Sequence, residues 1–161
     1  MKKILFTLFL SLSFFYACHD ENLEAKFETL KDKNYSEFKN MSIINRQGVY
    51  FVTYHDSIYK VKRSFFSKKI FVEKANNENI ESLLTKDDID IIEHALKSFD
   101  QMKILSLSID KNENILVSLP WYDRCTYYFF KLSSLNTLEE LKKQYYNHYE
   151  GNWYIDKECS K

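Results

Sequence analysis

VYFVTYHDSIYKVK, residues 49–62, holds two segments with the alternating pattern of a β-strand, one on each side of a short polar turn. The first segment, Val49–Tyr54, is β-branched or aromatic throughout, and such residues pack well on a pleated surface. His55 and Asp56 form the turn, and Ile58–Lys62 leads the chain back. The stretch therefore predicts a β-hairpin, and with it an antiparallel sheet.

Further segments of the same kind follow along the chain. Residues 69–74 (KIFVEK) predict a third strand after the hairpin, and residues 153–155 predict a short last strand. Three more strands are expected at residues 105–109, 115–119 and 126–132. We expect Pro120 to end the second of these, because proline has no N–H group for the sheet ladder.

Three helices are expected around these strands, each indicated by apolar residues on one face. The central helix begins at Thr85, which with Asp88 resembles a capping box. A C-terminal helix begins at Thr137 and ends before Gly151. The apolar positions are Leu23, Phe27, Leu30 and Phe38 in the first helix, Ile89, Ile92, Leu96 and Phe99 in the second, and Leu138, Leu141, Tyr145 and Tyr149 in the third.

The predicted order of elements is α-βββ-α-βββ-α-β. Consecutive hairpins of this kind are typical of an α+β fold, here an antiparallel sheet from two βββ meanders, each followed by a helix. No linker rich in Pro, Ser or Gly interrupts residues 23–161, which predicts a single domain. Two interpretations of the repeated order stay open: a duplicated module, over residues 48–99 and 102–150, or an ordinary meander that occurs twice.

The N-terminal residues have the parts of an export signal. A basic start (MKK) is followed by residues 4–16, which carry no charge. Such a run is too short to span a membrane, but it suits the apolar core of a signal peptide. It leads into FYAC, residues 15–18, which resembles the lipobox of a bacterial lipoprotein, although Phe15 and Tyr16 depart from the residues usual there.

This resemblance implies that residues 1–17 are removed and that Cys18 becomes the lipid-modified start of a tether, residues 18–22. The acyl chains on Cys18 would then anchor the protein in the bacterial outer membrane. Asp20 and Glu21, behind the cysteine, resemble a surface-export signal of some Gram-negative lipoproteins, so the periplasmic face and the cell surface both stay open. The alternative is an ordinary secretory signal that ends near a cysteine.

Two further cysteines, Cys125 and Cys159, would reach a compartment in which disulfides persist. A bridge between them would close a loop of about 35 residues and hold a terminus that otherwise frays. The alternatives are two free buried thiols, or a cysteine nucleophile paired with His94 or His148.

No arrangement of residues indicates catalysis, a metal or a cofactor. Residues 55–57 (HDS) are adjacent in a turn, so their side chains cannot converge as those of a catalytic triad do. Residues 110–114 (DKNEN) begin like a calcium loop, but the sixth and twelfth positions are Ile115 and Trp121 rather than Gly and Glu. Only two glycines occur, and 23 basic residues balance 23 acidic ones, which argues against a phosphate loop and a nucleic-acid partner.

One modification site is suggested by the hairpin. Asp56-Ser57-Ile58 resembles the acceptor of an O-glycosylation system in some Gram-negative bacteria, and a hairpin turn would expose it. Ser57 is therefore a candidate O-glycosylation site. The alternative is a chance match, since three residues occur together often.

Aromatic residues are unusually frequent, with 13 Phe, 12 Tyr and 2 Trp. In the strand predicted at 126–132, Tyr127 and Phe129 must face one side and Tyr128 and Phe130 the other. Core on both faces is one interpretation, and a contact surface is the other. The candidate contact residues, centred on the predicted C-terminal helix, are Trp121, Tyr122, Tyr145, Tyr146, Tyr149 and Trp153.

Together these observations favour a lipid-anchored envelope lipoprotein that acts as a non-enzymatic binding module, with a protein partner preferred over a glycan. One alternative is an immunity or inhibitor protein that neutralises an antibacterial toxin at the envelope. Another is a glycan-binding accessory lipoprotein. A flat aromatic patch would favour a protein, and a concave cleft with polar rims would favour a sugar.

Overall fold

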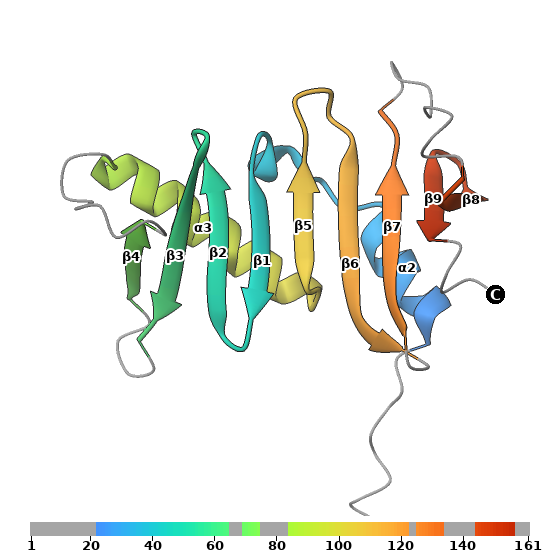
Figure 1. Cartoon of the computed structure of the whole chain (residues 1–161), viewed down its shortest axis with the longest axis horizontal. Helices are drawn as coiled ribbons and strands as arrows, with labels where there is room; N and C mark the ends of the chain where they lie inside the picture. Colours follow the sequence, from blue (N-terminus) through green and yellow to red (C-terminus); the bar gives the residue numbers. More distant parts are fainter. Residues whose placement is uncertain (1–21, 65–68, 75–83, 123–124, 134–143, 157–161) are drawn as a thin grey trace, which may run out of the picture. The chain divides into compact units, whose positions relative to one another are not determined.

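The computed structural model describes residues 22–64, 69–74, 84–122, 125–133 and 144–156 (Figure 1). The chain divides into two compact units, Met1–Asp32 and Lys33–Lys161. In the first unit the described element is helix α2, Leu23–Lys31, in which the side chain of Asn22 accepts a hydrogen bond from the N–H of Glu24. The predicted first helix is thus confirmed as far as Lys31. Phe38 belongs instead to the short 3-10 helix η2, Ser36–Phe38, in the second unit.

The described strands of the second unit form one antiparallel sheet in the order β4-β3-β2-β1-β5-β6-β7-β9-β8. The sheet and the helices confirm the α+β class. The strands are β1 Ser42–Arg46, β2 Val49–Tyr54, β3 Ser57–Arg63, β4 Ile70–Lys74, β5 Ser106–Ile109, β6 Ile115–Tyr122, β7 Cys125–Lys131, β8 Tyr146–Glu150 and β9 Trp153–Asp156.

The predicted hairpin is present as β2 and β3, which pair from Tyr54 and Ser57 at the turn onward. His55 and Asp56 both have positive φ, 47° and 57°, as a two-residue turn with the twist of the strands requires. β4 then pairs with β3 as expected. The sequence pattern did not predict β1. Its two adjacent isoleucines point to opposite faces of the sheet, so apolar and polar residues do not alternate along this strand. The first meander therefore has four strands rather than three.

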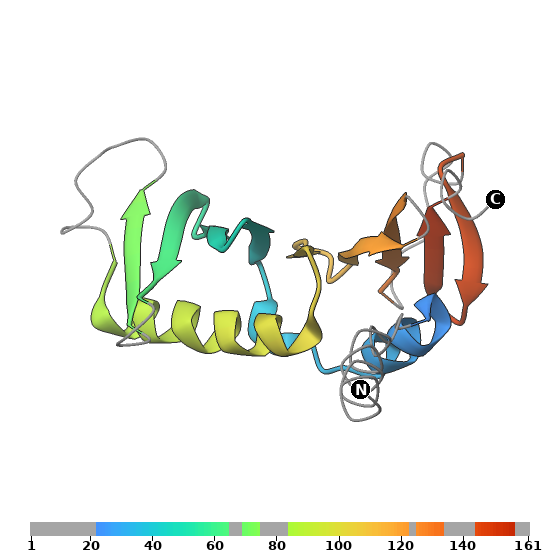
Figure 2. The same ribbon diagram turned by 90° about the horizontal axis from the view of Figure 1, so that it is seen from below.

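Helix α3, Lys86–Met102, begins with the predicted capping box, in which Thr85 and Asp88 each accept a hydrogen bond from the other's N–H. It connects β4, at one edge of the described sheet, to β5 beside β1. Four strand spacings of about 4.8 Å make roughly 19 Å, and a helix of 17 residues is about 25 Å long. α3 is therefore long enough to cross behind β3, β2 and β1, as Figures 1 and 2 show.

The face of the sheet that α3 covers, the inner face, holds the core. Phe99 on α3 packs edge-on against Tyr50 on β2, with ring centroids 6.2 Å apart. One cross-strand row on this face runs from β9 to β3 and is at most 5% exposed at every position. The row consists of Ile155, Phe129, Val117, Leu107, Ile43, Val52 and Tyr59.

Strand β6 does not end at Pro120, as the sequence predicted, but continues to Tyr122. The β5–β6 ladder reaches only to Ser118, so the missing N–H of Pro120 removes no bond on that side. On the other side the β6–β7 register shifts between Ser118 and Trp121. Pro120 thus lies at an irregularity, which is where a sheet tolerates proline.

The predicted C-terminal helix is wrong for residues 146–150, which form strand β8. Residues 137–143 of that prediction lie outside the described residues. Tyr145 and Tyr149 have helical spacing by coincidence, because β8 pairs with β9 through a turn at Gly151 and Asn152. Gly151, with φ of 55°, serves this hairpin turn rather than a helix end. The arrangement of two βββ meanders, each followed by a helix, is therefore not confirmed.

Candidate functional site

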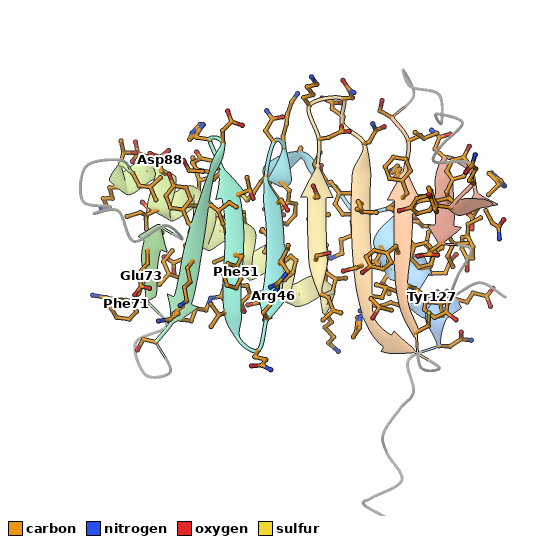
Figure 3. The ribbon with its side chains drawn as sticks, in the orientation of Figure 1. Arg46, Phe51, Phe71, Glu73, Asp88 and Tyr127 are labelled. Atoms are coloured by element: carbon orange, nitrogen blue, oxygen red, sulfur yellow. The ribbon has the colours of Figure 1, made fainter. Side chains whose placement is uncertain are left out.

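The face of the sheet opposite α3, which we call the open face, carries exposed apolar side chains. Tyr50 and Phe51 alternate on β2, so Phe51 points away from the face on which Tyr50 contacts α3. Figure 3 shows Arg46, Phe51, Phe71 and Glu73 on this face, and no described element of the second unit lies over it. We define the open-face patch as Ile44, Arg46, Phe51, Ile58, Lys60, Lys62, Phe71 and Glu73.

These eight side chains are brought together by strand register. Ile44, Phe51, Lys60 and Glu73 are consecutive cross-strand neighbours from β1 to β4. Directly paired residues on one face have Cβ atoms about 5 Å apart, so the four form a continuous row. Phe71 lies beside this row, opposite Lys62. The row thus unites residues up to 29 positions apart, which no local pattern relates.

Three of the four apolar side chains of the patch are exposed, and the fourth, Phe51, is partly buried. Phe71 is 58% exposed, Ile58 51% and Ile44 36%. Single exposed apolar residues are ordinary on a protein surface, whereas a contiguous group next to charges is typical of a contact surface. Phenylalanine at such a site supplies a large rigid area for burial against a partner.

The charged members of the patch leave an excess of positive charge. The patch holds three cations, Arg46, Lys60 and Lys62, and one carboxylate, Glu73. The ammonium of Lys62 lies 3.8 Å from that carboxylate, and the guanidinium of Arg46 lies 5.7 Å from the centre of the Phe51 ring. Because these contacts are solvent-exposed, the cations remain able to attract acidic groups of a partner.

A hollow of about 870 Å³ with a mixed polar and apolar lining borders the open face near the start of β1. Ser42, Thr53 and Ser108, which belong to one cross-strand row of that face, form part of its lining. The turns after β2 and β5 rise beside it and contribute His55 and Lys111. The open face is therefore hollowed at one end, beside the open-face patch.

The opposite end of the open face is a small core rather than a contact surface. Phe130 and Leu132 are buried there, and Leu116, Tyr146 and Tyr154 pack against them. The rings of Phe130 and Tyr146 have centroids 5.6 Å apart. The predicted alternation in β7 is confirmed, since Tyr127 and Phe129 are buried in the inner face while Tyr128 on the open face is 38% exposed.

The structure does not bring the predicted aromatic contact residues onto one surface. Trp153 is buried in the inner face at 4% exposure, and Tyr149 packs against Phe129 of the same face. Tyr146 lies on the open face within the small core, and Tyr145 is exposed in the turn before β8. Strand alternation causes this separation, whereas the helix expected there would have grouped the tyrosines. Trp121 and Tyr122 end β6.

The turn at residues 110–114 is held by its own side chains, as a polar turn would be. The Asp110 carboxylate accepts hydrogen bonds from the N–H groups of Asn112 and Asn114, both at 2.9 Å. The Asn114 amide donates to the same carboxylate, and its oxygen accepts from the N–H of Ser133. In the described part of the chain, no three His, Cys, Asp or Glu side chains are grouped as metal ligands would be.

Of the remaining predicted sites, Ser57 and Cys125 lie among the described residues. Ser57 is the first residue of β3, directly after the exposed Asp56, so it lies on the expected hairpin. Cys125 begins β7. Cys18 and Cys159 lie outside the described residues. None of the described helices has the length and apolar character needed to cross a membrane.

The residue pattern did not predict the open-face patch, although one feature of β2 indicated it. In residues 49–54 five of the six residues are apolar or aromatic and only Thr53 is polar, whereas a strand with one solvated face usually alternates with polar residues. No protein-family model, curated protein or solved structure matches this chain. Its candidate function therefore depends on the residues and their geometry.

Proposed function

We propose that this chain is a lipid-anchored protein of the bacterial outer membrane that binds a protein partner through the open-face patch, without catalysis. The anchor is supported by the signal-like N-terminus and by FYAC at residues 15–18. The binding role is carried by one observation: exposed Ile44, Ile58 and Phe71 alternate with cations on an otherwise regular sheet face.

The composition of the patch fits a protein interface better than a ligand pocket. Aromatic residues and arginine are enriched where protein interfaces concentrate their binding energy. Small-molecule sites are concave and enclose most of their ligand, whereas the patch lies on a sheet face over β1–β4. A partner surface that covers β2–β4 would bury Phe51 and Phe71 together.

The charge of the patch favours a partner with an acidic surface. Three cations and one carboxylate attract such a surface and accelerate its association, and they repel basic surfaces. If that partner is an antibacterial toxin, the chain is an immunity protein that covers the toxin at the envelope. The glycan-binding alternative gains no support from this face.

Photo-crosslinking in cells tests the proposed surface. A photoreactive amino acid is placed at Phe51 or Phe71 of the full chain, and as a matched control at Ile91 or Lys97, which are exposed on α3. We expect one discrete protein adduct from the patch positions and none from the controls. Adducts that are equal at all four positions, or absent from the patch, would contradict the proposal.

Charge reversal makes the same test quantitative. Arg46→Glu combined with Lys60→Glu should reduce the adduct at Phe71 at least several-fold, because the acidic partner is then repelled. Lys97→Glu, a charge reversal at an exposed position on α3, should leave the adduct unchanged. Circular dichroism of each variant shows that the fold is retained.

The anchor has its own test. Cells that express the full chain with Cys18→Ala should incorporate no labelled fatty acid into it, and the variant should leave the membrane fraction. Cys125→Ser serves as the control and should stay labelled. A Cys18→Ala chain that still carries label would refute the anchoring part and leave the binding part unaffected.

A further inference from the structure

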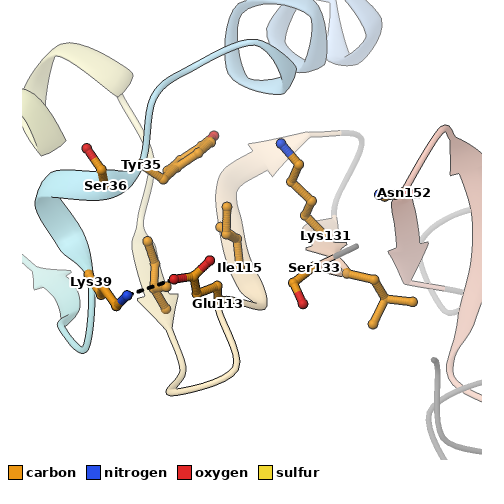
Figure 4. Close-up of a pocket in the computed structure, with 10 residues that line it drawn as sticks. Tyr35, Ser36, Lys39, Glu113, Ile115, Lys131, Ser133 and Asn152 are labelled. Carbon is orange, nitrogen blue, oxygen red and sulfur yellow. Dashed lines mark hydrogen bonds and ion pairs between the residues drawn. The ribbon is translucent and has the colours of Figure 1, made fainter. Parts of the chain in front are cut away.

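A pocket of about 500 Å³ with a mixed polar and apolar lining lies on the inner-face side of the sheet, at the ends of β5, β6 and β7 (Figure 4). Its size is in the range of small-molecule sites, about 300–1,000 Å³. Ile109, Ile115 and Lys131 line it from one cross-strand row, and Tyr35 and Ser36 line it from the side of η2. The pocket is separate from the open-face patch, which lies on the other face.

Lys131 supplies a positive charge that no described carboxylate balances. Its cross-strand neighbour on β9 is Trp153, and the Lys131 ammonium lies 5.3 Å from the centre of that indole ring. Among the ion pairs of the described residues, none includes Lys131. A cation over an indole is stabilised by the ring's negative face, so the ammonium can stay half-buried without a counter-ion. One negative group of a ligand would complete the site.

The other two charged groups of the pocket neutralise each other. The ammonium of Lys39, next to η2, and the carboxylate of Glu113, in the turn after β5, form an ion pair of 2.7 Å. Figure 4 shows the two side chains pointing toward each other, with a dashed line that marks the ion pair. The net charge of the pocket is therefore that of Lys131 alone. A doubly charged anion would be left with one unbalanced charge near Glu113.

Hydroxyl and amide groups make up much of the remaining wall. Ser36, Ser133 and Asn152 line the pocket, and each can both donate and accept hydrogen bonds. The phenol of Tyr35 is buried, and this burial raises its pKa, so the hydroxyl keeps its proton at neutral pH. Such a wall matches a ligand with several hydroxyl groups, and the side chains of Ile109 and Ile115 offer an apolar surface for its C–H groups.

The walls are held in place before any ligand arrives. The N–H of Leu132 donates to the carbonyl of Asn152 at 2.9 Å, which joins the end of β7 to the β8–β9 turn. The N–H of Ser133 donates to the side chain of Asn114 at 3.1 Å, which joins the same segment to the β5–β6 turn. A preformed site loses less conformational entropy on binding.

We infer that this pocket binds a small polyhydroxylated carboxylate, a sugar acid, whose carboxylate pairs with Lys131 and whose hydroxyls contact Ser36, Ser133 and Asn152. The inference is independent of the proposed protein partner, because it uses a different face of the sheet.

Calorimetric titration of the full, detergent-solubilised protein tests the inference. D-glucuronate is the probe, and D-glucose, D-glucose 6-phosphate and acetate are the comparison ligands. We expect glucuronate to bind at least about tenfold more tightly than each of the others, since only it combines one negative charge with several hydroxyls. Equal binding of glucose, tighter binding of the phosphate or of acetate, or no binding of glucuronate would each overturn the inference.

Two variants distinguish the role of the Lys131 charge from a general loss of folding. Lys131→Met keeps an unbranched apolar chain on Trp153 but removes the charge, so glucuronate affinity should fall about tenfold or more while the protein stays folded. Lys111→Met, in the β5–β6 turn outside this pocket, should leave affinity unchanged. Retained affinity in Lys131→Met would refute the assigned carboxylate contact.

Discussion

The hydroxyl of Tyr50 on β2 donates a 2.7 Å hydrogen bond to the carboxylate of Asp100, in the last turns of α3. Arg63 on β3 donates to the same carboxylate, and its guanidinium lies 5.5 Å from the centre of the Tyr50 ring. An acidic residue near the C-terminal end of a helix is disfavoured by the helix dipole. Tyr50 and Arg63 offset that cost and join α3 to two strands of the first meander.

Removal of the Tyr50 hydroxyl should destabilise the protein measurably. Tyr50→Phe keeps the ring against Phe99 but leaves Asp100 with one donor fewer. Since hydrogen bonds to charged groups contribute about 1.5–3 kcal/mol, we expect the free energy of unfolding in urea to fall by about that amount. Tyr54→Phe removes a 3.1 Å bond to Asp88 near the exposed start of α3 and should cost less than about 1 kcal/mol. Equal losses in both variants would contradict the assignment.

The same tyrosine predicts a loss of stability at alkaline pH. Burial of Tyr50, its hydrogen bond to Asp100 and the nearby negative charge raise its pKa from 10.0 to about 12, partly opposed by Arg63. Between these values the unfolded chain loses the proton while the folded protein keeps it. The contribution to stability is therefore complete below about pH 10 and is lost as pH rises to about 12.

The difference in unfolding free energy between wild type and Tyr50→Phe isolates this effect, because other titrating groups contribute equally to both proteins. We expect the difference to be constant from pH 7 to about pH 9 and to shrink above about pH 10. Urea unfolding at several pH values measures it. A difference that stays the same up to pH 11 would show that the pKa of Tyr50 is not raised.

Ile43 and Ile44 are a matched pair for the two faces of the sheet. They are adjacent in β1, yet Ile43 is 0% exposed in the inner face and Ile44 is 36% exposed on the open face. Ile43→Ala should cost about 2–5 kcal/mol, because it leaves a cavity in the core row. Ile44→Ala should cost less than about 1 kcal/mol, since its side chain keeps much of its contact with water. Chemical denaturation measures both, and similar losses would mean that the face assignment of β1 is wrong.

The cysteines lead to a further prediction, a Cys125–Cys159 disulfide. Cys125 begins β7, and Cys159 lies outside the described residues. An export signal would take the chain to a compartment in which disulfides persist, and these two cysteines allow one pairing there.

Non-reducing mass spectrometry with thiol labelling should find both cysteines oxidised. Reduction should lower the unfolding free energy by about 3–4 kcal/mol, as expected for a closed loop of about 35 residues. Cys125→Ser and Cys159→Ser should each show a similar loss and become insensitive to reductant. Two labelled thiols in the untreated protein would exclude the bridge.

Much of the fold could be predicted where the signal was local. The hairpin of β2 and β3 depends on a two-residue turn between alternating segments, and the start of α3 depends on Thr85 and Asp88 three residues apart. Each involves neighbours in the chain, so composition and spacing indicate them directly. β8 was mistaken for a helix because Tyr145 and Tyr149 fit the helical period, and only pairing with β9 gives residues 146–150 their extended form.

The candidate sites could not be predicted in the same way. Ile44, Phe51, Lys60 and Glu73 become neighbours through the registers of three strand pairs, and the ammonium of Lys131 reaches Trp153 across two paired strands. A shift of one residue in any register would turn the side chains of a strand to the other face. The sequence alone was sufficient for the α+β class, the main hairpin and the capped helix, because short-range turn and capping chemistry specifies them. Strand order, the uncovered face and the pocket follow only from long-range pairing, since the free energy that selects a register comes from burying one face of the whole sheet.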